Sequence, residues 1–444
     1  MSVGLDIGTT SSQMVLSRLM IENRASAFAV PELAIAERQI RYRSPVHVTP
    51  LLDEYRVDAE TLRKLVAEEY RKAGICREDV DTGAVIITGE TGRKENARAV
   101  LEKLSDFAGD FVVATAGPDL ESVLAARGAG AVEYAQKTGK TLLHMDIGGG
   151  TSNLALIREG KIVKTGCLNV GGRLLKLTGD GVITYVSPVL QDLTRLCVGD
   201  RVSREQVKEV ARLLVEGLEM AAGLRQRGEL LERLWTKECG PSWTAAGAVI
   251  SFSGGVADCI DREGDWLRYG DMGPVLGKAI RESRLCVDGY VLGRETIRAT
   301  VIGAGCYSTQ LSGSTVFFRN VTLPIKNLPV VGLTDCSPET IRRELGKLDG
   351  EGILALPGME APSYRQVAAL AEQILRGISG SRVLVCLQQD MAKALGQALA
   401  ARMDEDAQIL CIDRVKLPEG SFLDVGEPVG PALPVVVKTL VLSK

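Results

Sequence analysis

The chain has 444 residues, of which 45% are hydrophobic and 25% are charged, a composition typical of globular proteins with roughly two to three domains. Its formal net charge of −3 argues against a broad surface for nucleic acid or for anionic membranes. Its apolar runs fall short of the ~20 residues needed to span a bilayer, and no basic segment precedes Asp6 as in a secretory signal. We therefore expect a cytoplasmic protein, or one in a compartment reached without such a signal, with neither nucleic acid nor membrane as a partner.

The cysteines and histidines do not form a recognisable metal or redox motif. The ten cysteines are scattered without any C-x-x-C spacing, which argues against a zinc ribbon or a dithiol redox pair. Cys306, Cys386 and Cys411 lie in apolar runs, so we expect buried free thiols. The two histidines, His47 and His144, are far apart. The apolar run around His144 favours a packed core histidine over a metal ligand.

The first third of the chain alternates predicted strands with predicted helices. Residues 1–30 have the pattern of a strand meander, and apolar positions on one helical face predict a helix over 57–74 that ends at Gly74. The next predicted elements are two short buried strands and a helix, at 83–88, 111–114 and 118–126. This alternation predicts an α/β fold.

The middle of the chain repeats this order. A strand at 141–147 leads into a hairpin that turns at Glu159-Gly160, and an amphipathic helix over 203–222 has Ser203 as its cap. The other predicted elements are a surface helix with a loop, a buried strand and a helix, at 225–247, 248–253 and 299–307.

The pattern changes after about residue 318. Prolines at positions 324, 329 and 338 indicate a junction. The third unit that follows has predicted strands near 352–356, 382–387 and 408–412, predicted helices near 338–348, 363–378 and 390–403, and a β-rich tail. We therefore expect three domains, at 1–135, 136–318 and 319–444.

Two stretches of the chain are variants of one pattern. Residues 3–16 read V-G-L-D-I-G-T-T-S-S-Q-M-V-L, and residues 143–156 read L-H-M-D-I-G-G-G-T-S-N-L-A-L. At an offset of 146 − 6 = 140 they match at Asp6/Asp146, Ile7/Ile147, Gly8/Gly148 and Ser12/Ser152, with near matches at Gln13/Asn153 and Leu16/Leu156. In each, an apolar run stops at an aspartate, a Gly/Thr turn follows, and an alternating run resumes. The pattern predicts a strand, a tight turn and a strand, used twice.

The two turns have the composition of phosphate-binding turns. Backbone N–H groups converge closely on a phosphate only where glycine or small residues form the turn. The candidate phosphate ligands are Gly8, Thr9, Thr10, Gly148, Gly149, Gly150 and Thr151. Asp6 and Asp146 stand at the mouths of the turns, where their carboxylates can hold the water shell of Mg²⁺. Two ordinary hairpin turns are the competing interpretation, and the repeated aspartate argues against it.

A third element of the candidate site is the segment I-S-F-S-G-G-V at 250–256. A buried strand that ends in Gly254-Gly255 lets a flat adenine and its ribose lie on the backbone. A Gly-Gly pair after a strand is weak evidence for nucleotide binding by itself. It becomes strong evidence where it follows two candidate phosphate turns in this order. Together the three elements predict ATP or ADP and Mg²⁺ as ligands.

This order of motifs resembles the actin, Hsp70 and sugar-kinase ATPase superfamily. The resemblance covers roughly residues 1–318. It implies an α/β fold of two ribonuclease-H-like lobes that clasp ATP and magnesium, with two connecting helices that cross the cleft as a hinge. It places the first connection at 117–130 and the second at 300–305, which includes Gly303, and it assigns a further family turn to Gly171-Gly172.

The same resemblance implies an acidic residue on the first connection. Hsp70-like members carry an acid there that positions the attacking water, and both Asp119 and Glu121 fit this position. An acid at a helix N-terminus that only complements the helix dipole is the alternative interpretation.

A narrower resemblance extends through the third unit. The strings I-I-T-G-E-T, C-L-N-V-G-G-R-L-L, R-A-T-V-I-G-A-G and the tail F-L-D-V-G-E-P are similar to those of ethanolamine ammonia-lyase reactivating factors. This resemblance covers nearly the whole chain, with the third unit as a C-terminal α/β domain. It implies an ATPase that remodels ethanolamine ammonia-lyase, releasing damaged cobalamin so that adenosylcobalamin can enter. The implied location is the cytoplasm or a bacterial microcompartment, and cobalamin is an indirect partner, met through the lyase.

Two other functions of the same fold remain as alternatives. A metabolite kinase needs an aspartate base that faces a small hydroxylated substrate, and the chain shows no sugar-kinase-like substrate motif. A filament-forming or scaffold protein would use ATP only as a structural ligand. A radical-enzyme activator with an iron–sulfur cluster is disfavoured by the scattered cysteines.

Overall fold

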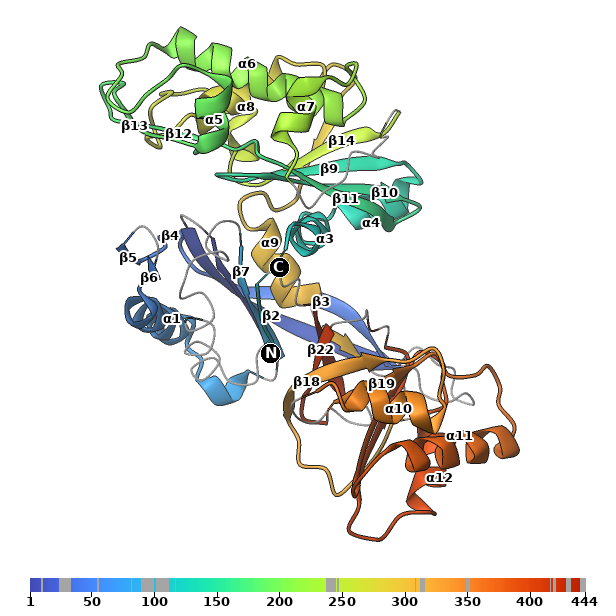
Figure 1. The fold of residues 1–444 in the computed structure, drawn as a ribbon. Coiled ribbons are helices and arrows are strands. Elements are labelled where there is room, and N and C mark those ends of the chain that lie inside the picture. The colour runs from blue at the N-terminus through green and yellow to red at the C-terminus, as the bar shows by residue number, and fades with distance from the viewer. Residues whose placement is uncertain are drawn as a thin grey trace.

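The computed structural model describes residues 1–8, 11–23, 33–53, 56–80, 82–88, 100, 112–115, 117–236, 245, 247–307, 309–311, 316–348, 352–415, 417, 421–428 and 433–439. Three large β-sheets, each with its own helices, form three units (Figure 1). In the part of the chain that is described, every helix is too short or too polar to reach across a lipid bilayer.

The first unit, called lobe I, is built on a sheet with the order β3-β2-β1-β7-β8. Its strands are β1 (Ser2–Ile7), β2 (Ser11–Asn23), β3 (Leu33–Arg43), β4 (His47–Val48), β7 (Thr82–Ile87) and β8 (Val112–Thr115), with the small pair β5 (Leu51–Asp53) and β6 (Arg56–Val57) beside it. The pairs β1–β2 and β2–β3 are antiparallel, whereas β1–β7 and β7–β8 are parallel. Helix α1 (Ala59–Ala73) begins after Asp58, ends at Gly74 with φ 68°, and buries its apolar face against β1; the 3₁₀ turn η1 (Arg77–Asp79) follows it.

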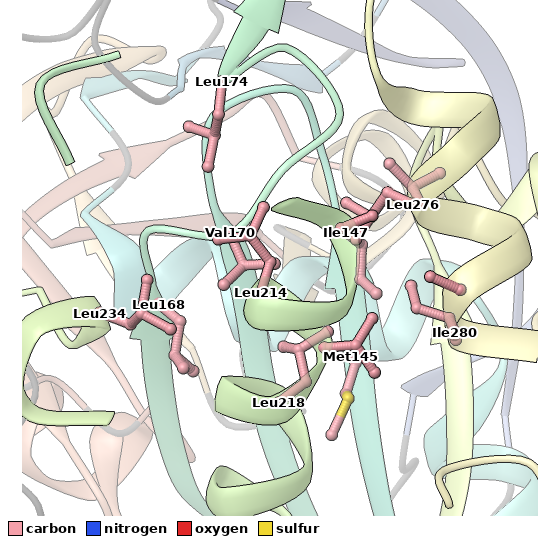
Figure 2. Close-up of a cluster of buried hydrophobic side chains, with 14 of the residues drawn as sticks. Met145, Ile147, Leu168, Val170, Leu174, Leu214, Leu218, Leu234, Leu276 and Ile280 are labelled. Atoms are coloured by element: carbon pink, nitrogen blue, oxygen red, sulfur yellow. The ribbon is translucent and has the colours of Figure 1, made fainter. Parts of the chain in front are cut away.

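The second unit, lobe II, is built on a sheet with the order β11-β10-β9-β14-β15. Its strands are β9 (Leu142–Ile147), β10 (Ser152–Arg158), β11 (Lys161–Leu168), β14 (Val249–Ser253) and β15 (Tyr290–Leu292), with the hairpin β12 (Leu175–Leu177) and β13 (Ile183–Val186) apart from them. Its helices are α5 (Pro188–Leu193), α6 (Arg204–Ala221), α7 (Glu229–Leu234), η3 (Ala257–Cys259) and α8 (Gly273–Arg281). Met145 and Ile147 of β9 pack against leucines of α6 and α8 in the core of this lobe (Figure 2). Because neighbouring residues of a strand point to opposite faces, His144 and Asp146 lie on the face turned away from that core.

The two lobes share one topology. In lobe II the pairs β9–β10 and β10–β11 are antiparallel and the pairs β9–β14 and β14–β15 are parallel, as for their counterparts in lobe I. If only the five strands along each main path are numbered in chain order, both sheets have the order 3-2-1-4-5, which is the ribonuclease-H-like arrangement. The repeated order confirms the predicted fold class, an actin/Hsp70-like pair of lobes with an additional α/β domain.

Two helices lie between the lobes and touch each other backbone to backbone (Figure 1). Helix α3 (Pro118–Gly128), followed by α4 (Ala131–Thr138), crosses α9 (Ala299–Tyr307). A Cβ on Gly128 would stand 1.8 Å from the Ala299 carbonyl oxygen, and one on Gly303 would stand 2.1 Å from that of Leu124. Only glycine fits at these two contacts. The helices predicted as interlobe connections therefore form one close crossing.

The C-terminal unit has an eight-stranded sheet with the order β16-β23-β22-β18-β19-β20-β21-β17. Its strands are β16 (Thr309–Leu311), β17 (Phe317–Arg319), β18 (Ile325–Gly332), β19 (Ile353–Leu356), β20 (Arg382–Leu387), β21 (Gln408–Ile412), β22 (Ser421–Val425) and β23 (Pro434–Thr439). Strands β18 to β21 are parallel and are joined by α10 (Pro338–Leu345), α11 (Tyr364–Gly377) and α12 (Ala392–Ala400). The helices cover one face of the sheet, and residues of β22 and β23 share a second core with the other face.

Most elements expected from the sequence are present within one or two residues of their predicted bounds. The hairpin turn at Glu159-Gly160 has positive φ at both residues, 50° and 69°, and Ser203 caps α6 by accepting from the Gln206 N–H. The expected buried free thiols Cys306, Cys386 and Cys411 are buried and unpaired with other cysteines in the described residues. Part of the 225–247 segment lies outside the described residues, and the described remainder contains α7. The domain limits at 135/136 and 318/319 stay predictions.

Candidate functional site

The two predicted turns are present at equivalent places in the two lobes. In lobe I the Gly8 N–H donates to the Ser11 carbonyl oxygen at 2.9 Å, and in lobe II the Gly148 N–H donates to that of Thr151 at the same distance. Beyond the turns, Ile7 pairs with Ser12 and Ile147 with Ser152. Thr9 and Thr10 of the first turn lie outside the described residues. The sequence repeat thus corresponds to a structural repeat of strand, tight turn and strand.

Different groups support the two turns. In lobe I the Thr49 hydroxyl donates to the Gly8 carbonyl oxygen at 2.7 Å. In lobe II the Gly172 N–H donates to the Gly148 carbonyl oxygen at 3.0 Å. A Cβ on Gly171 would stand only 2.3 Å from the Gly149 carbonyl oxygen. The glycine pair assigned by resemblance therefore lies directly behind the second turn, and backbone rather than a side chain supports it.

The two aspartates are held by hydroxyl groups and influence each other. Thr88 donates to Asp6 Oδ1 at 2.8 Å. Burial raises the pKa of Asp6 to about 7, the Thr88 hydrogen bond opposes this rise, and the negative charge of Asp146 adds to it. Burial also raises the pKa of Asp146 to about 6, against hydrogen bonds from Ser253 and Thr300 that lower it. Two carboxylates from opposite lobes, Asp146 buried and Asp6 half-buried, thus repel each other, which is an arrangement that a cation between them would stabilise.

An amide side chain lies directly opposite each aspartate. Gln13 pairs with Asp6 and Asn153 pairs with Asp146 in the antiparallel ladders. Gln13 Nε2 donates to the Ile297 carbonyl oxygen at 3.1 Å, and Asn153 Nδ2 donates to Glu121 Oε2 at 2.8 Å. Because these partners only accept, the orientation of both amides is determined. The two amide oxygens are buried and have no hydrogen-bond partner among the described residues.

The whole chain matches one protein family. A model of the family described as "Ethanolamine utilisation protein EutA" matches residues 1–443. The curated relatives include the ethanolamine ammonia-lyase reactivases EutA of Escherichia coli K12 and Salmonella typhimurium LT2. Each is 37% identical to this chain, over 99% of the chain and 98% of the relative. The chain belongs to the EutA family.

Solved structures similar to this EutA-family chain cover about two thirds of it. A PPX-GPPA enzyme of Aquifex aeolicus matches with a TM-score of 0.42 and 12% identity, over 68% of this chain and 98% of that one. The ethanolamine utilization protein EutJ of Carboxydothermus hydrogenoformans matches with a TM-score of 0.34 and 16% identity, over 69% of this chain and 89% of that one. The repeated strand order, rather than these low TM-scores, defines the fold.

The structure separates the two acidic candidates on the first connecting helix of this EutA-family chain. Glu121 in the first turn of α3 is 7% exposed and accepts from Asn153, the residue opposite Asp146. Asp119 is exposed and accepts a hydrogen bond from the Thr165 hydroxyl on β11. Only Glu121 is thus connected to the aspartate of the second turn.

The remaining candidate glycines lie in two different places. Gly254, with φ 88°, stands against the end of β9, where a Cβ would be 2.3 Å from the Ile147 carbonyl oxygen. Gly255 follows it, next to the Ile297 side chain. Gly303 instead lies at the crossing of α3 and α9, and that contact accounts for its missing side chain. Its assignment to nucleotide binding stays a prediction.

Sequence reasoning missed the side chains that support the site. The near match of Gln13 with Asn153 in the repeat was the signal for the two amides. Thr88 and Thr49 gave no comparable signal, because each lies in another strand or loop and meets the first turn only in three dimensions. Arg173 and Asp271 form an ion pair of 3.1 Å beside Gly149, and this pair was also not predicted.

Proposed function

We propose that this EutA-family chain is an ATP-dependent reactivating factor for ethanolamine ammonia-lyase. The observation that carries the proposal is the 37% identity, over 99% of the chain, to two curated ethanolamine ammonia-lyase reactivases. The repeated aspartate turns support the ATP requirement, because two tight glycine turns beside carboxylates fit the phosphates and the cation of a nucleotide. The factor releases damaged cobalamin from the inactivated lyase, and adenosylcobalamin then enters. Its place of action is the cytoplasm or the microcompartment that holds the lyase.

The two turns fit the phosphates of ATP or ADP. Chain neighbours apart, no described atom lies within 4 Å of the position of a Cβ on Gly150, and the three atoms nearest to one on Gly149 belong to the Arg173 side chain. The turn therefore has an open side where its N–H groups can meet a phosphate. We assign phosphate binding to Gly8, Thr9, Thr10, Gly148, Gly149, Gly150 and Thr151, with Gly171 and Gly172 as their support and Gly254 and Gly255 next to the adenosine.

The carboxylate and amide oxygens fit hydrated Mg²⁺. Mg²⁺ prefers oxygen ligands and retains several of its waters. Asp6 and Asp146 supply negative charge from opposite lobes, and the buried oxygens of Gln13 and Asn153 can accept hydrogen bonds from the metal-bound water. When bound, the cation neutralises phosphate charge during hydrolysis.

Glu121 is the residue that we assign to the attacking water. Its carboxylate accepts a hydrogen bond from the Asn153 amide, and Asn153 lies opposite Asp146 in the strand ladder. A carboxylate fixed in this way can orient a water and accept its proton. Asp119, whose carboxylate meets Thr165 at the surface, is left out of this step.

The helix crossing couples the site to the movement of the lobes. The Thr300 side chain of α9 lies close enough to Asp146 of lobe II to lower the pKa of that carboxyl, and α9 also packs against β1 of lobe I at Gly4. ATP binds groups of both lobes and so favours their closed pairing, to the extent that it binds the closed state more tightly than the open state, and ADP favours a looser pairing. We assign contact with the lyase to the C-terminal unit, whose strand β16 follows α9 and pairs with β23.

Reactivation of the lyase tests the proposal. Ethanolamine ammonia-lyase inactivated with hydroxocobalamin is mixed with this protein, Mg²⁺, adenosylcobalamin and either ATP or a non-hydrolysable analogue. We expect activity to return only with ATP, and release of the damaged cobalamin to precede it. An ATPase that leaves the lyase inactive would contradict the proposal, and ATP consumption that requires a small hydroxylated substrate would support a kinase instead.

A further inference from the structure

A hydrogen-bonded row of buried polar side chains ends at Asp146. We call Ser251, His144 and Ser253 the His144 network. His144 Nδ1 lies 2.8 Å from Ser251 Oγ, and His144 Nε2 lies 2.9 Å from Ser253 Oγ. Ser253 in turn donates to Asp146 Oδ1. His144 is 0% exposed, so its ring is closed to solvent and each ring nitrogen has a serine hydroxyl as a hydrogen-bond partner.

Strand register explains why these side chains meet. In the parallel pair β9–β14, Ser251 is opposite His144 and Ser253 is opposite Asp146. Residues two apart in a strand share a face, so the four side chains occupy one face of the sheet. The intervening Met145 and Phe252 lie in the hydrophobic core on the other face.

The chemistry of the groups sets the direction of the hydrogen bonds. An ionised carboxylate only accepts, so Ser253 must donate its proton to Asp146. The Ser253 oxygen then accepts from His144, which requires a proton on Nε2. Ser251 donates to the other ring nitrogen in the neutral imidazole. The histidine thus keeps the Ser253 hydroxyl pointed at Asp146 and prevents it from turning elsewhere.

Lobe I shows that the fold does not need this row. The equivalent positions on β1 and β7 are Gly4, Ala84 and Ile86, and the same parallel ladder forms with them. The polar residues of lobe II are therefore not required by the strand pairing. Buried polar groups have a cost that must be offset by their hydrogen bonds, which indicates a role for them beside Asp146.

We propose that His144 is a positioning residue, which acts through Ser253 to hold the Asp146 carboxylate in the geometry that receives the hydrated cation. The inference rests on the proposed nucleotide site and adds to it a neutral histidine two residues before the aspartate. Residues of this kind hydrogen-bond to a metal ligand and orient it without touching the metal. Their removal typically lowers metal affinity or activity by about 10- to 100-fold.

Variants of the network test the proposal through the Mg²⁺ dependence of ATP hydrolysis. S253A removes the hydroxyl between the ring and the carboxylate, and we expect the Mg²⁺ concentration for half-maximal activity to rise about 10- to 100-fold. H144L removes both hydrogen bonds of the ring and should raise it about tenfold. H144Q keeps an N–H donor near the position of Nε2 and should recover most of the loss. ATP affinity measured in EDTA should remain that of the unaltered protein in all three.

A double variant separates positioning from packing. If His144 acts through Ser253, H144L should add little to the effect of S253A on Mg²⁺ dependence, because the connection is already broken. If His144 only fills space, the two effects should add. S187A is the matched control, since Ser187 is a buried hydroxyl of the same lobe that caps α5 away from the site. It should lower stability and leave the Mg²⁺ dependence unchanged.

The ring itself can be observed without any change at the site. The chain has two histidines, so H47Q leaves His144 as the only imidazole in a ¹⁵N NMR spectrum of the nucleotide-free protein. We expect a neutral ring with its proton on Nε2, and a change in the Nε2 shift in H47Q/S253A. A ring without a proton on Nε2 would overturn the proposal even if H144L or S253A failed to fold.

The outcomes distinguish this inference from the proposed function. A protein that binds and hydrolyses ATP but shows unchanged Mg²⁺ dependence in H144L and S253A would overturn the role of His144 alone. An unaltered protein that does not bind ATP would overturn the proposed nucleotide site and the role of His144 with it. Additive effects in H144L/S253A would assign His144 to packing.

Discussion

The two lobes use the same strand ladder for different purposes beneath their aspartates. In lobe I, Gly4 lies two residues before Asp6, and α9 packs so closely there that a Cβ would stand 2.4 Å from the Val301 carbonyl oxygen. In lobe II the equivalent residue is His144, bonded to two serines. The face that lobe I uses for helix packing therefore serves carboxylate positioning in lobe II.

The groups that support the two turns also differ between the lobes. The second turn rests on the backbone of Gly171-Gly172, whereas in the first turn the Gly8 carbonyl oxygen accepts from the Thr49 hydroxyl. Each aspartate accepts from one hydroxyl group, Asp146 from Ser253 and Asp6 from Thr88, and Ser253 is itself within hydrogen-bond distance of the buried His144 ring. We infer that lobe II presents the more rigid half of the site and that lobe I adapts to what lobe II has bound. Four substitutions test this difference.

The largest effect is expected from Asp146→Asn, which keeps the shape of the side chain and removes its charge. ATP hydrolysis should fall about 10²- to 10³-fold, by analogy with the loss of one preorganised electrostatic group. Hydrolysis should fall less in Asp6→Asn, because that carboxylate belongs to lobe I, the half of the site that we infer to be adaptable. Steady-state phosphate release measures both, with circular dichroism as the control for folding. A greater loss in D6N, or hydrolysis in D146N close to that of the unaltered protein, would contradict the ranking.

Glu121→Gln should have the next largest effect, on turnover rather than on binding. Asn153, which lies opposite Asp146, donates a hydrogen bond to the Glu121 carboxylate. Gln13, which lies opposite Asp6, instead donates to a backbone carbonyl group. Loss of a residue that orients water typically lowers kcat by about 10²-fold or more, with ATP affinity unchanged. Asp119→Asn is the matched control on the same helix and should leave kcat unchanged. If D119N lost activity and E121Q did not, the assignment of the two acids would be reversed.

Gly171→Ala tests the backbone support of the second turn. The new methyl group would meet the Gly149 carbonyl oxygen at 2.3 Å, so the turn must move. We expect a loss of about 1–3 kcal/mol in the free energy of unfolding, as for an overpacked interior, and weaker ATP binding measured by calorimetry. Gly179→Ala, where no described atom lies within 4 Å of the new Cβ, is the control. Unchanged ATP affinity in G171A would show that the turn tolerates displacement.

The sequence predicted the parts of the site that are local in the chain. The offset between Asp6 and Asp146 predicted the repeated turn, and apolar periodicity predicted α1, α6 and most elements of the C-terminal unit. The repeated topology then follows, because two similar strand–turn–strand segments in the same context fold alike.

The sequence did not predict what depends on strands distant in the chain. Ser253 meets Asp146 only because β14 pairs with β9 in one register, and a shift of one residue would turn both serines to the other face. The choice between Asp119 and Glu121 depended on how α3 lies across β10 and β11. Gly303 shows the opposite case. The resemblance assigned this glycine to the nucleotide site, but its close contact with α3 explains equally well why the residue is glycine.

The smallest effect is expected from the first turn, in Thr49→Val. The substitution keeps the shape of the buried side chain and removes the hydroxyl that donates to the Gly8 carbonyl oxygen at 2.7 Å and meets Ser12 Oγ at 3.0 Å. Loss of these two interior hydrogen bonds should lower the free energy of unfolding by about 1–2 kcal/mol. Since lobe I is inferred to be the adaptable half, bound nucleotide should restore the turn, and ATP affinity should fall by less than in G171A.

Chemical denaturation with and without ATP measures both quantities, and Thr49→Ser, which retains the hydroxyl, should behave like the unaltered protein. If T49V weakened ATP binding more than G171A did, lobe I rather than lobe II would be the rigid half of the site.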